Sequence, residues 1–381
     1  MIRKGWIIIL VTIISLAGCR DEFDPEIDDY DNLLVVDGLL TNEEGPYTIR
    51  LSRTASVDKP DYNPLSGCTV KLHENTGYTE ELTEVDSGVY QTAPDGLQTQ
   101  IGNSYKLSVN TPDGETYESD FIELREPVGI QSITHDLEFH ETNEYPKPLP
   151  GYQFFVSTEA AQKQDAYFLW RMMETYEYTS EFRIHYIYRG MGIEEFLNND
   201  TLYRCWKTAK VPEFFTGSTQ ALNSTQVKKK PLHFVSTEGK RIQVRYSLLL
   251  KQFTISSEAY HFWTDVREQV TGDDFLFSSQ PYPIRGNMRN VDDSDDIVLG
   301  YFTVGSVAKN RIFVDRPEDV TFYYQRCVVN TDLRGLGYLG PDDFPVYLTN
   351  SPEGIGMASE YCFDCTLYGG KLNKPAFWVD K

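Results

Sequence analysis

The sequence is short of positive charge. It holds 35 Lys and Arg against 57 Asp and Glu in 381 residues, which gives a formal net charge of −22 at pH 7. Nucleic acids and anionic lipid surfaces carry charge of the same sign and repel such a chain. This composition excludes nucleic-acid binding and favours neutral or cationic partners.

The sequence also lacks the short motifs of common catalytic sites. It has no Gly-x-Ser-x-Gly and no His-Glu-x-x-His, and its six histidines are scattered without the spacing of metal ligands. Carboxylate pairs that hydrolyse glycosides are defined by their spatial separation, so the many acidic residues leave that one route open. We expect a protein that is not an enzyme and has no cofactor and no metal site.

The first 18 residues have the pattern of a signal peptide. Two basic residues precede an apolar run over residues 5–15, which is shorter than the roughly 20 residues that span a membrane. Leu-Ala-Gly-Cys at residues 16–19 then fits the cleavage site of a lipoprotein. We expect cleavage before Cys19 and lipidation of that residue by a diacylglycerol and an acyl chain (palmitate), which together make a stable anchor. The alternative is an ordinary secretory signal with a chance cysteine.

The segment after the cysteine is acidic. Residues 20–29 contain six Asp and Glu side chains and one proline. Such a composition does not bury a core, and anionic headgroups repel it. We therefore expect residues 19–30 to form a lipidated, solvated tether that holds the globular part away from the membrane.

The composition favours strands. Tyr and Phe number 25 and 21, and Thr and Val are frequent. Through residues 32–124, short segments with alternating apolar residues are separated by Gly, Pro and Asn turns. This spacing predicts a mainly β protein that begins with an immunoglobulin-like β-sandwich over residues 31–125.

The second predicted domain covers residues 126–381. Pro127 marks its start, because proline interrupts a strand ladder. Residues 167–175 alternate as a strand does, and the aromatic run from Tyr176 to Tyr188 continues this character. We interpret the aromatic run as packing rather than as a ligand platform. The domain is expected to be larger than the first, β-rich, and to contain one or two helices.

One helix is predicted over Ser257–Val270. Its apolar residues recur at helical spacing, and Thr271-Gly272 ends it. The apolar stripe is expected to pack on a sheet. His261 lies beside this stripe, and we interpret it as an ordinary, partly exposed histidine rather than a ligand or base.

Five cysteines remain besides Cys19. An oxidising compartment favours disulfides among Cys205, Cys327, Cys362 and Cys365, and we expect Cys68 to stay free. Zinc binding by the four cysteines and redox catalysis by the Cys-x-x-Cys pair are the alternatives. We prefer pairings in which Cys362 and Cys365 each bond to Cys205 or Cys327, because these would fasten the C-terminal tail to the second domain.

An acidic loop at Asn290–Asp296 is the one candidate for calcium. It concentrates four carboxylates, which are hard oxygen donors. However, it lacks the central Gly and terminal Glu of the common calcium loop. We interpret it as a solvated loop.

Several motifs recur in a fixed order in the second half of the chain. They are Gln280–Asn287 with Asn290, Leu299–Phe302, Cys362–Cys365, Gly369-Gly370 and Lys374–Trp378. Together with the lipoprotein signal, this set resembles the domain-of-unknown-function family 4249, which consists of lipoproteins of Bacteroidota. The resemblance implies an outer-membrane lipoprotein whose gene lies beside that of a TonB-dependent receptor, with no established activity. The acidic tether then resembles the signal that sends such lipoproteins to the cell surface; the alternative is a flexible spacer on a protein facing the periplasm.

These observations lead to one functional expectation with two alternatives. We expect a surface-exposed lipoprotein of the outer membrane that acts as a binding accessory of a TonB-dependent receptor in ligand capture or uptake. The first alternative is a structural or adhesive envelope protein, and the second is an envelope hydrolase. The ligand-binding residues are not identified from the sequence; Tyr176–Tyr188 and Pro281-Tyr-Pro283 are candidates.

Overall fold

The computed structural model describes residues 32–55, 62–160, 165–220, 225–271 and 283–380. These residues form five sheets, and the mainly β fold expected from the composition is confirmed. The helices in the described ranges are α2 (Ser257–Thr271), η2 (Leu333–Tyr338), η3 (Pro341–Asp343), η4 (Glu360–Cys362) and η5 (Cys365–Tyr368). None of them is long and apolar enough to cross a membrane. The expected signal peptide, the tether and Cys19 lie outside the described residues.

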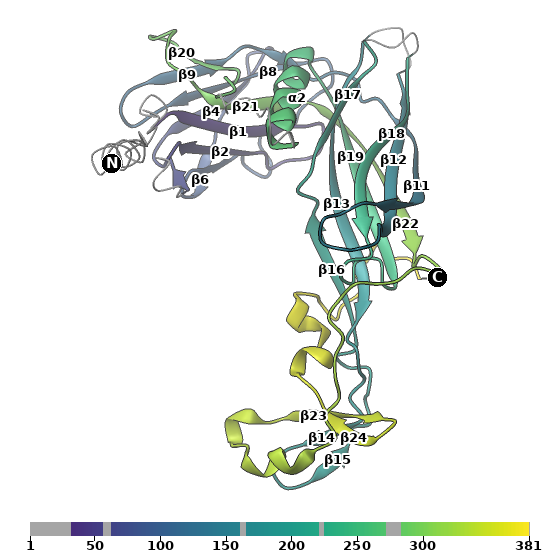
Figure 1. The fold of residues 1–381 in the computed structure, drawn as a ribbon. Coiled ribbons are helices and arrows are strands. Elements are labelled where there is room, and N and C mark those ends of the chain that lie inside the picture. Colours follow the sequence, from purple (N-terminus) through teal and green to yellow (C-terminus); the bar gives the residue numbers. More distant parts are fainter. Residues whose placement is uncertain (1–31, 56–61, 161–164, 221–224, 272–282, 381) are drawn as a thin grey trace, which may run out of the picture.

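The first sandwich has two sheets that enclose one core (Figure 1). One sheet has the order β21-β1-β2-β7-β6, with β3 beside β2. Its strands are β1 (Leu34–Leu40), β2 (Thr48–Arg53), β3 (Asn63–Pro64), β6 (Thr83–Asp86), β7 (Val89–Gln91) and β21 (Leu299–Val304). The other sheet has the order β20-β9-β8-β4-β5, with β10 beside β8. Its strands are β4 (Thr69–Glu74), β5 (Thr79–Glu81), β8 (Ser104–Asn110), β9 (Thr116–Ser119), β10 (Ile122–Glu123) and β20 (Met288–Asn290).

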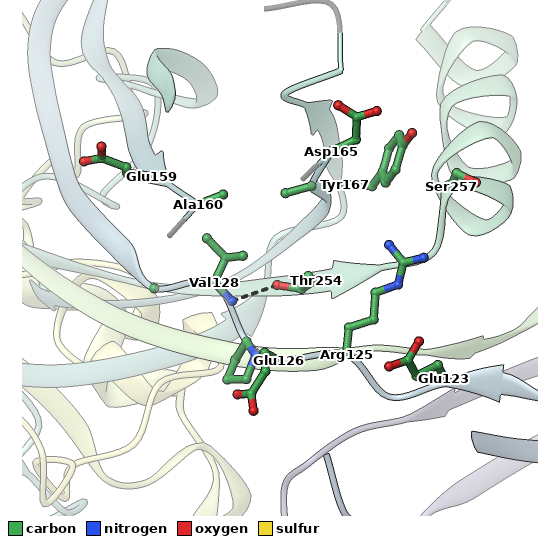
Figure 2. A pocket seen from close by; sticks show the side chains of 13 residues that line it. Glu123, Arg125, Glu126, Val128, Glu159, Ala160, Asp165, Tyr167, Thr254 and Ser257 are labelled. Carbon is green, nitrogen blue, oxygen red and sulfur yellow. Dashed lines mark hydrogen bonds between the residues drawn. The ribbon is translucent and has the colours of Figure 1, made fainter. Parts of the chain in front are cut away.

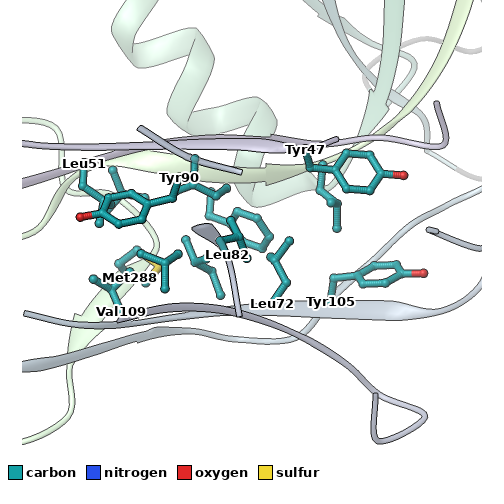
Figure 3. Packing of buried hydrophobic residues seen from close by; sticks show 14 of the residues in the cluster. Tyr47, Leu51, Leu72, Leu82, Tyr90, Tyr105, Val109 and Met288 are labelled. Carbon is teal, nitrogen blue, oxygen red and sulfur yellow. The ribbon is translucent and has the colours of Figure 1, made fainter. Parts of the chain in front are cut away.

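Alternation along the strands builds the core of this sandwich. In β1, Leu34, Val36 and Leu40 are at most 1% exposed, whereas Asp37 faces solvent. Figure 3 shows aromatic and aliphatic side chains of both sheets meeting between the layers. Each fully buried side chain of this kind contributes about 1.5–3 kcal/mol to stability. The two-layer arrangement is present, and its assignment to the immunoglobulin-like class stays a prediction.

Two strands of the first sandwich come from far along the chain. β21 lies parallel to β1, with Val36 opposite Gly300, and β20 lies antiparallel to β9. Met288 and Phe302 from these strands are buried in the first core (Figure 3 shows Met288). The expected boundary after residue 125 therefore assigns β20 and β21, which belong to this sandwich, to the second predicted domain. A boundary drawn along the sequence does not reveal such a return of the chain.

The second sandwich also has two sheets around one core. Their orders are β11-β12-β18 and β16-β13-β19-β22, with β17 beside β13. The strands are β11 (Ile130–His140), β12 (Leu149–Glu159), β13 (Tyr167–Thr179), β16 (Arg204–Lys210), β17 (Phe215–Ser218), β18 (Gln226–Ser236), β19 (Arg245–Ile255) and β22 (Ser306–Asp315). Phe154, Trp170 and Tyr246 are fully buried in this core. Its long strands form the second β-rich region that we expected from the sequence.

Helix α2 lies between the two sandwiches (Figure 1). It begins after Ser256, whose hydroxyl accepts a hydrogen bond from the Ala259 backbone N–H at 3.2 Å. The Phe262 ring packs 4.7 Å from that of Tyr301 in β21, and Trp263 Nε1 donates to Thr303 Oγ1 at 3.1 Å. The helix expected from the sequence is therefore present and packs on the sheets, as its apolar stripe predicted. It fixes the strand that returns to the first sandwich.

A smaller sheet lies at the end of the second sandwich farthest from the first (Figure 1). Its order is β15-β14-β23-β24, and its strands are β14 (Tyr186–Tyr188), β15 (Ile193–Glu195), β23 (Val346–Ser351) and β24 (Gly354–Met357). We call residues 186–197 and 333–357, which contain these strands with η2 and η3, the tip module. The aromatic run from Tyr176 to Tyr188 passes from β13 into this module, and Tyr178 on it is only 1% exposed. Tyr178, at least, therefore has a packing role, as we interpreted the aromatic run.

Candidate functional site: a charged cleft between the two sandwiches

A cleft of about 810 Å³ lies where the chain passes from the first sandwich to the second (Figure 2). Its walls come from the linker after β10, the end of β12, the start of β13 and the beginning of α2. Three regions of the chain that are distant in sequence therefore meet there: the linker, the neighbouring ends of β12 and β13, and the segment from the end of β19 to the start of α2. Ligand sites occur preferentially at such junctions between domains.

The floor of the cleft is held by hydrogen bonds. The Val128 N–H donates to Thr254 Oγ1 at 3.0 Å, and Gln252 Nε2 donates to the Val128 carbonyl at 2.7 Å (Figure 2 shows the first bond). Gln252 is fully buried, and its Oε1 accepts a bond of 2.9 Å from Trp170 Nε1. These bonds fix the linker backbone on β19 and make the cleft a preformed feature.

Five exposed charged side chains line the cleft. Glu123, Arg125 and Glu126 come from the linker region, and Glu159 and Asp165 come from β12 and the approach to β13. None of them forms an ion pair or a side-chain hydrogen bond with another residue of the described ranges. Figure 2 shows the Arg125 side chain extending toward the start of α2, with Glu159 on the opposite side. One cation thus shares the cleft with four carboxylates, and it also lies near Glu258 in the first turn of α2, whose charged form it favours.

Tyr167 also lines this cleft. The residue as a whole is 6% exposed, and its ring centroid lies 5.4 Å from that of Tyr260. Burial raises the pKa of Tyr167; the charge of Asp165 raises it further, and that of Arg125 lowers it. Both charged groups therefore lie close enough to act on the phenol, which stays a neutral donor and acceptor.

A second cleft of about 410 Å³ adjoins the first. Glu123 and Arg125 line both clefts, and the second reaches Asn287 and Tyr301. Arg125 therefore stands between two hollows that meet at the start of α2. No local pattern in the sequence indicated this site, because Arg125 and its neighbours were interpreted only as a domain boundary.

The motifs that carry the family resemblance have structural roles beside this site. Asn287 Nδ2 donates to the Phe302 carbonyl at 2.8 Å, and the Phe302 N–H donates to Asn287 Oδ1 at 2.9 Å. The Gly286 N–H donates to the Val298 carbonyl at 2.8 Å. These bonds lock β21 against the preceding loop. Of the Pro281-Tyr-Pro283 candidate, residues 281–282 lie outside the described residues.

The four C-terminal-half cysteines form two disulfides. Cys205 bonds to Cys365 and Cys327 bonds to Cys362, each across a Cα–Cα distance just under 6 Å. This agrees with the preferred pairings and leaves none of the four as a thiolate for zinc or for redox catalysis. Cys68 is free, as expected, and burial raises the pKa of its thiol.

The acidic loop at Asn290–Asp296 uses its polar groups internally. Asn290 Oδ1 accepts from the backbone of Asp292 at 3.0 Å, and Asp296 Oδ2 accepts from Tyr117 and from Asn290. In the ranges that the structure describes, no three His, Cys, Asp or Glu side chains are placed to hold a metal ion.

The tip module presents a different kind of surface. Met191, Leu197 and Tyr338 are each at least 87% exposed. Such side chains can be buried by a protein partner if they form one patch. The sequence did not single out any of these residues.

Comparison with known proteins adds a family and no activity. The family model described as Domain of unknown function (DUF4249) matches residues 20–311. The match ends within β22, so the strands β23 and β24 of the tip module and three of the four disulfide cysteines lie beyond it. No curated protein matches the chain.

Proposed function

Because the chain belongs to the DUF4249 family, whose model spans most of its length, we propose that it is a lipoprotein of the outer membrane that assists a TonB-dependent receptor in ligand capture. In this proposal Cys19 carries the lipid, the acidic residues 20–29 hold the globular part away from the membrane, and the protein faces the outside of the cell. It acts by binding and performs no catalysis.

The observation that carries the binding role is the charged cleft. Charged side chains that line a preformed hollow and have no partner in the described chain are available to a ligand. The exposed apolar side chains of the tip module are available to a partner protein. In this proposal the cleft binds the ligand and the tip module binds the receptor.

Affinity purification of the tagged, natively lipidated protein from outer membranes tests the partner. We expect one TonB-dependent receptor to be recovered in a stoichiometric amount. A photo-crosslinking residue at Leu197 in the tip module should attach to that receptor, whereas the same residue at Val85 of β6, which is 54% exposed, should not. Recovery of the lipoprotein alone would contradict the proposal.

The anchor has a separate test. Replacement of Cys19 removes the only side chain of the signal that accepts the lipid. We expect Cys19→Ser to abolish labelling by a palmitate analogue and to release the protein from the membrane fraction. The matched control is Cys68→Ser, which should change neither readout.

The exposed tip also supports a structural or adhesive role as the second candidate. A protein of that kind would bury Met191, Leu197 and Tyr338 against an envelope component and would not take part in transport. Deletion of the gene distinguishes the two functions: loss of uptake with normal attachment supports the receptor accessory, and the opposite result supports adhesion.

A further inference from the structure

We propose that residues 372–380, which we call the strap, lift away from the second sandwich while the rest of the protein stays folded. In the closed arrangement the strap lies on the sheet β16-β13-β19-β22, against Phe313 of β22. When the strap lifts, this part of the sheet is exposed. The inference goes beyond the proposed function and does not depend on it.

The strap begins where the chain passes an edge of this sheet. Lys371 exchanges two backbone hydrogen bonds, of 2.8 and 2.9 Å, with Trp206 of the edge strand β16. Just before it, Cys365 is fixed by its disulfide to Cys205. These bonds hold the chain up to Lys371, so the hinge of the strap lies directly after that residue.

The face that the strap covers is the outer face of the sheet. The neighbours of Phe313 in β22, Ile312 and Val314, pack in the core of the second sandwich. Because successive side chains of a strand point to opposite faces, Phe313 points away from that core. The Trp378 ring lies 5.4 Å from the Phe313 ring, so the strap reaches β22, the edge strand opposite β16.

The strap has no polar bond to the sheet. Within the described chain, no hydrogen bond or ion pair joins residues 372–380 to another segment. The Lys374–Asp380 ion pair of 2.6 Å and the bond of 2.9 Å from the Trp378 N–H to the Pro375 carbonyl are both internal to the strap. The strap can therefore leave the sheet without breaking a hydrogen bond.

Two aromatic side chains hold the strap in place. The Arg311 guanidinium lies 3.6 Å from the centroid of the Phe377 ring, although Phe377 is 40% exposed. Trp378, against Phe313, is the one buried residue of the strap. The closed arrangement thus depends mainly on the burial of a single side chain.

That burial leaves N–H donors without acceptors. Nε1 of Trp378 is buried and has no hydrogen-bond partner among the described residues, and the same is true of Nε and Nη1 of Arg245. Arg245 packs on the same Phe313 ring, at 5.2 Å, and its Nε lies 3.7 Å from Asp315, which is too far for a hydrogen bond. An unpaired buried donor costs free energy of the same order as an aromatic side chain gains by burial. Lifting the strap gives these donors access to water.

One electrostatic attraction opposes the lifting. Lys374 lowers the pKa of Asp380, and the charges of Arg204 and Arg245 lower it further, so Asp380 lies near both guanidinium groups. Asp380 is exposed, and salt screens attraction between exposed charges. Higher ionic strength should therefore favour the lifted strap.

Hydrogen exchange of the indole N–H groups, followed by NMR of the isotope-labelled full mature chain, tests the inference. Trp170 is the reference, because it is fully buried and its Nε1 donates to Gln252. We expect the Trp378 indole to exchange at least about a hundredfold faster than the Trp170 indole. Low urea concentrations should accelerate exchange at Trp170 and hardly change it at Trp378, because lifting the strap exposes little surface.

A matched pair of variants locates the opening. Phe377→Ala removes one of the two rings that hold the strap and should raise the exchange rate of Trp378 about tenfold, with no change at Trp170. The control is Phe121→Ala beside β10, which removes a ring that is 50% exposed and lies 5.7 Å from Nζ of Lys106. It should change neither rate.

Two results would overturn the inference. One is exchange at Trp378 that is as slow as at Trp170 and rises as steeply with urea, since the strap would then open only when the whole protein unfolds. The other is an equal acceleration of both indoles in Phe377→Ala, which would show a general loss of stability. Neither result bears on recovery of the receptor from outer membranes.

Discussion

The hydroxyl of Tyr178 donates a hydrogen bond of 2.7 Å to the carbonyl oxygen of Cys365, although 187 positions separate the two residues. Both residues are at most 1% exposed. Gly370 lies so close that a Cβ on it would come within 2.3 Å of the same hydroxyl. The C-terminal tail is therefore fitted onto β13 by a buried hydrogen bond as well as by the Cys205–Cys365 disulfide.

Removal of the Tyr178 hydroxyl should destabilise the protein. Tyr178→Phe leaves the Cys365 carbonyl buried without its partner, and we expect a loss of about 1–3 kcal/mol in the free energy of unfolding. Urea unfolding followed by tryptophan fluorescence measures it. Tyr338→Phe, at an exposed position of the tip module, is the control and should change the midpoint little. Equal midpoints for the two variants would contradict the role assigned to Tyr178.

The two disulfides should differ in their contribution to stability. Cys205–Cys365 closes 160 residues and Cys327–Cys362 closes 35. In the chain-entropy model the longer loop constrains the unfolded chain more, by about 1 kcal/mol. We expect the double serine variant of the first pair to unfold at lower urea than that of the second. The opposite order would show that local packing around Cys327 and Cys362 outweighs loop entropy.

Gly300 should tolerate no side chain. It has a φ of +74°, and a Cβ there would lie 2.1 Å from the Val36 carbonyl oxygen on the neighbouring strand β1. Gly300→Ala should therefore separate β21 from β1 and cost about 2–4 kcal/mol. Gly337→Ala is the matched control, because a Cβ at Gly337 meets nothing within 4 Å. Similar thermal midpoints for both variants would contradict this explanation.

His233 should make stability depend on pH. It is 5% exposed and its Nε2 has no hydrogen-bond partner among the described residues. Burial lowers the pKa of His233 to about 4. The carboxylate of Glu213, 3.6 Å from Nδ1, raises this pKa in part, and the charge of Arg241 lowers it further. The same side chain in the unfolded chain takes up its proton near pH 6.5. Between about pH 6.5 and pH 4 the unfolded state thus binds more protons, and acidification through this window should cost up to about 3 kcal/mol.

Comparison of variants isolates this effect. His233→Gln cannot be protonated, so its free energy of unfolding should fall less than that of the wild type between pH 7 and pH 4.5. His261→Gln, on the exposed side of α2, should retain the wild-type slope. A slope that is identical in all three proteins would assign the acid sensitivity to other groups.

The sequence predicted those features that local patterns determine. The alternating segments within residues 32–124 and the helical spacing over Ser257–Val270 each indicated the correct kind of element, because each pattern depends on neighbours within a few positions. The possible disulfide pairings could be narrowed because the chain has few cysteines. By contrast, the pairing of Val36 with Gly300 depends on a return of the chain that no local pattern records. The cleft was missed for the same reason: Arg125 comes to lie beside Glu159 and Asp165 only through the packing of regions that are distant in sequence.

The parallel pairing of β21 with β1 bears on how the chain is made. A ribosome releases the N-terminal end first, so β1 appears long before the strand that lies beside it. Until residues 299–304 have been synthesised, that side of β1 presents unpaired N–H and carbonyl groups, which another chain can pair with. The first sandwich is thus among the last parts of the molecule to be completed, and a product truncated before Leu299 would be prone to aggregate.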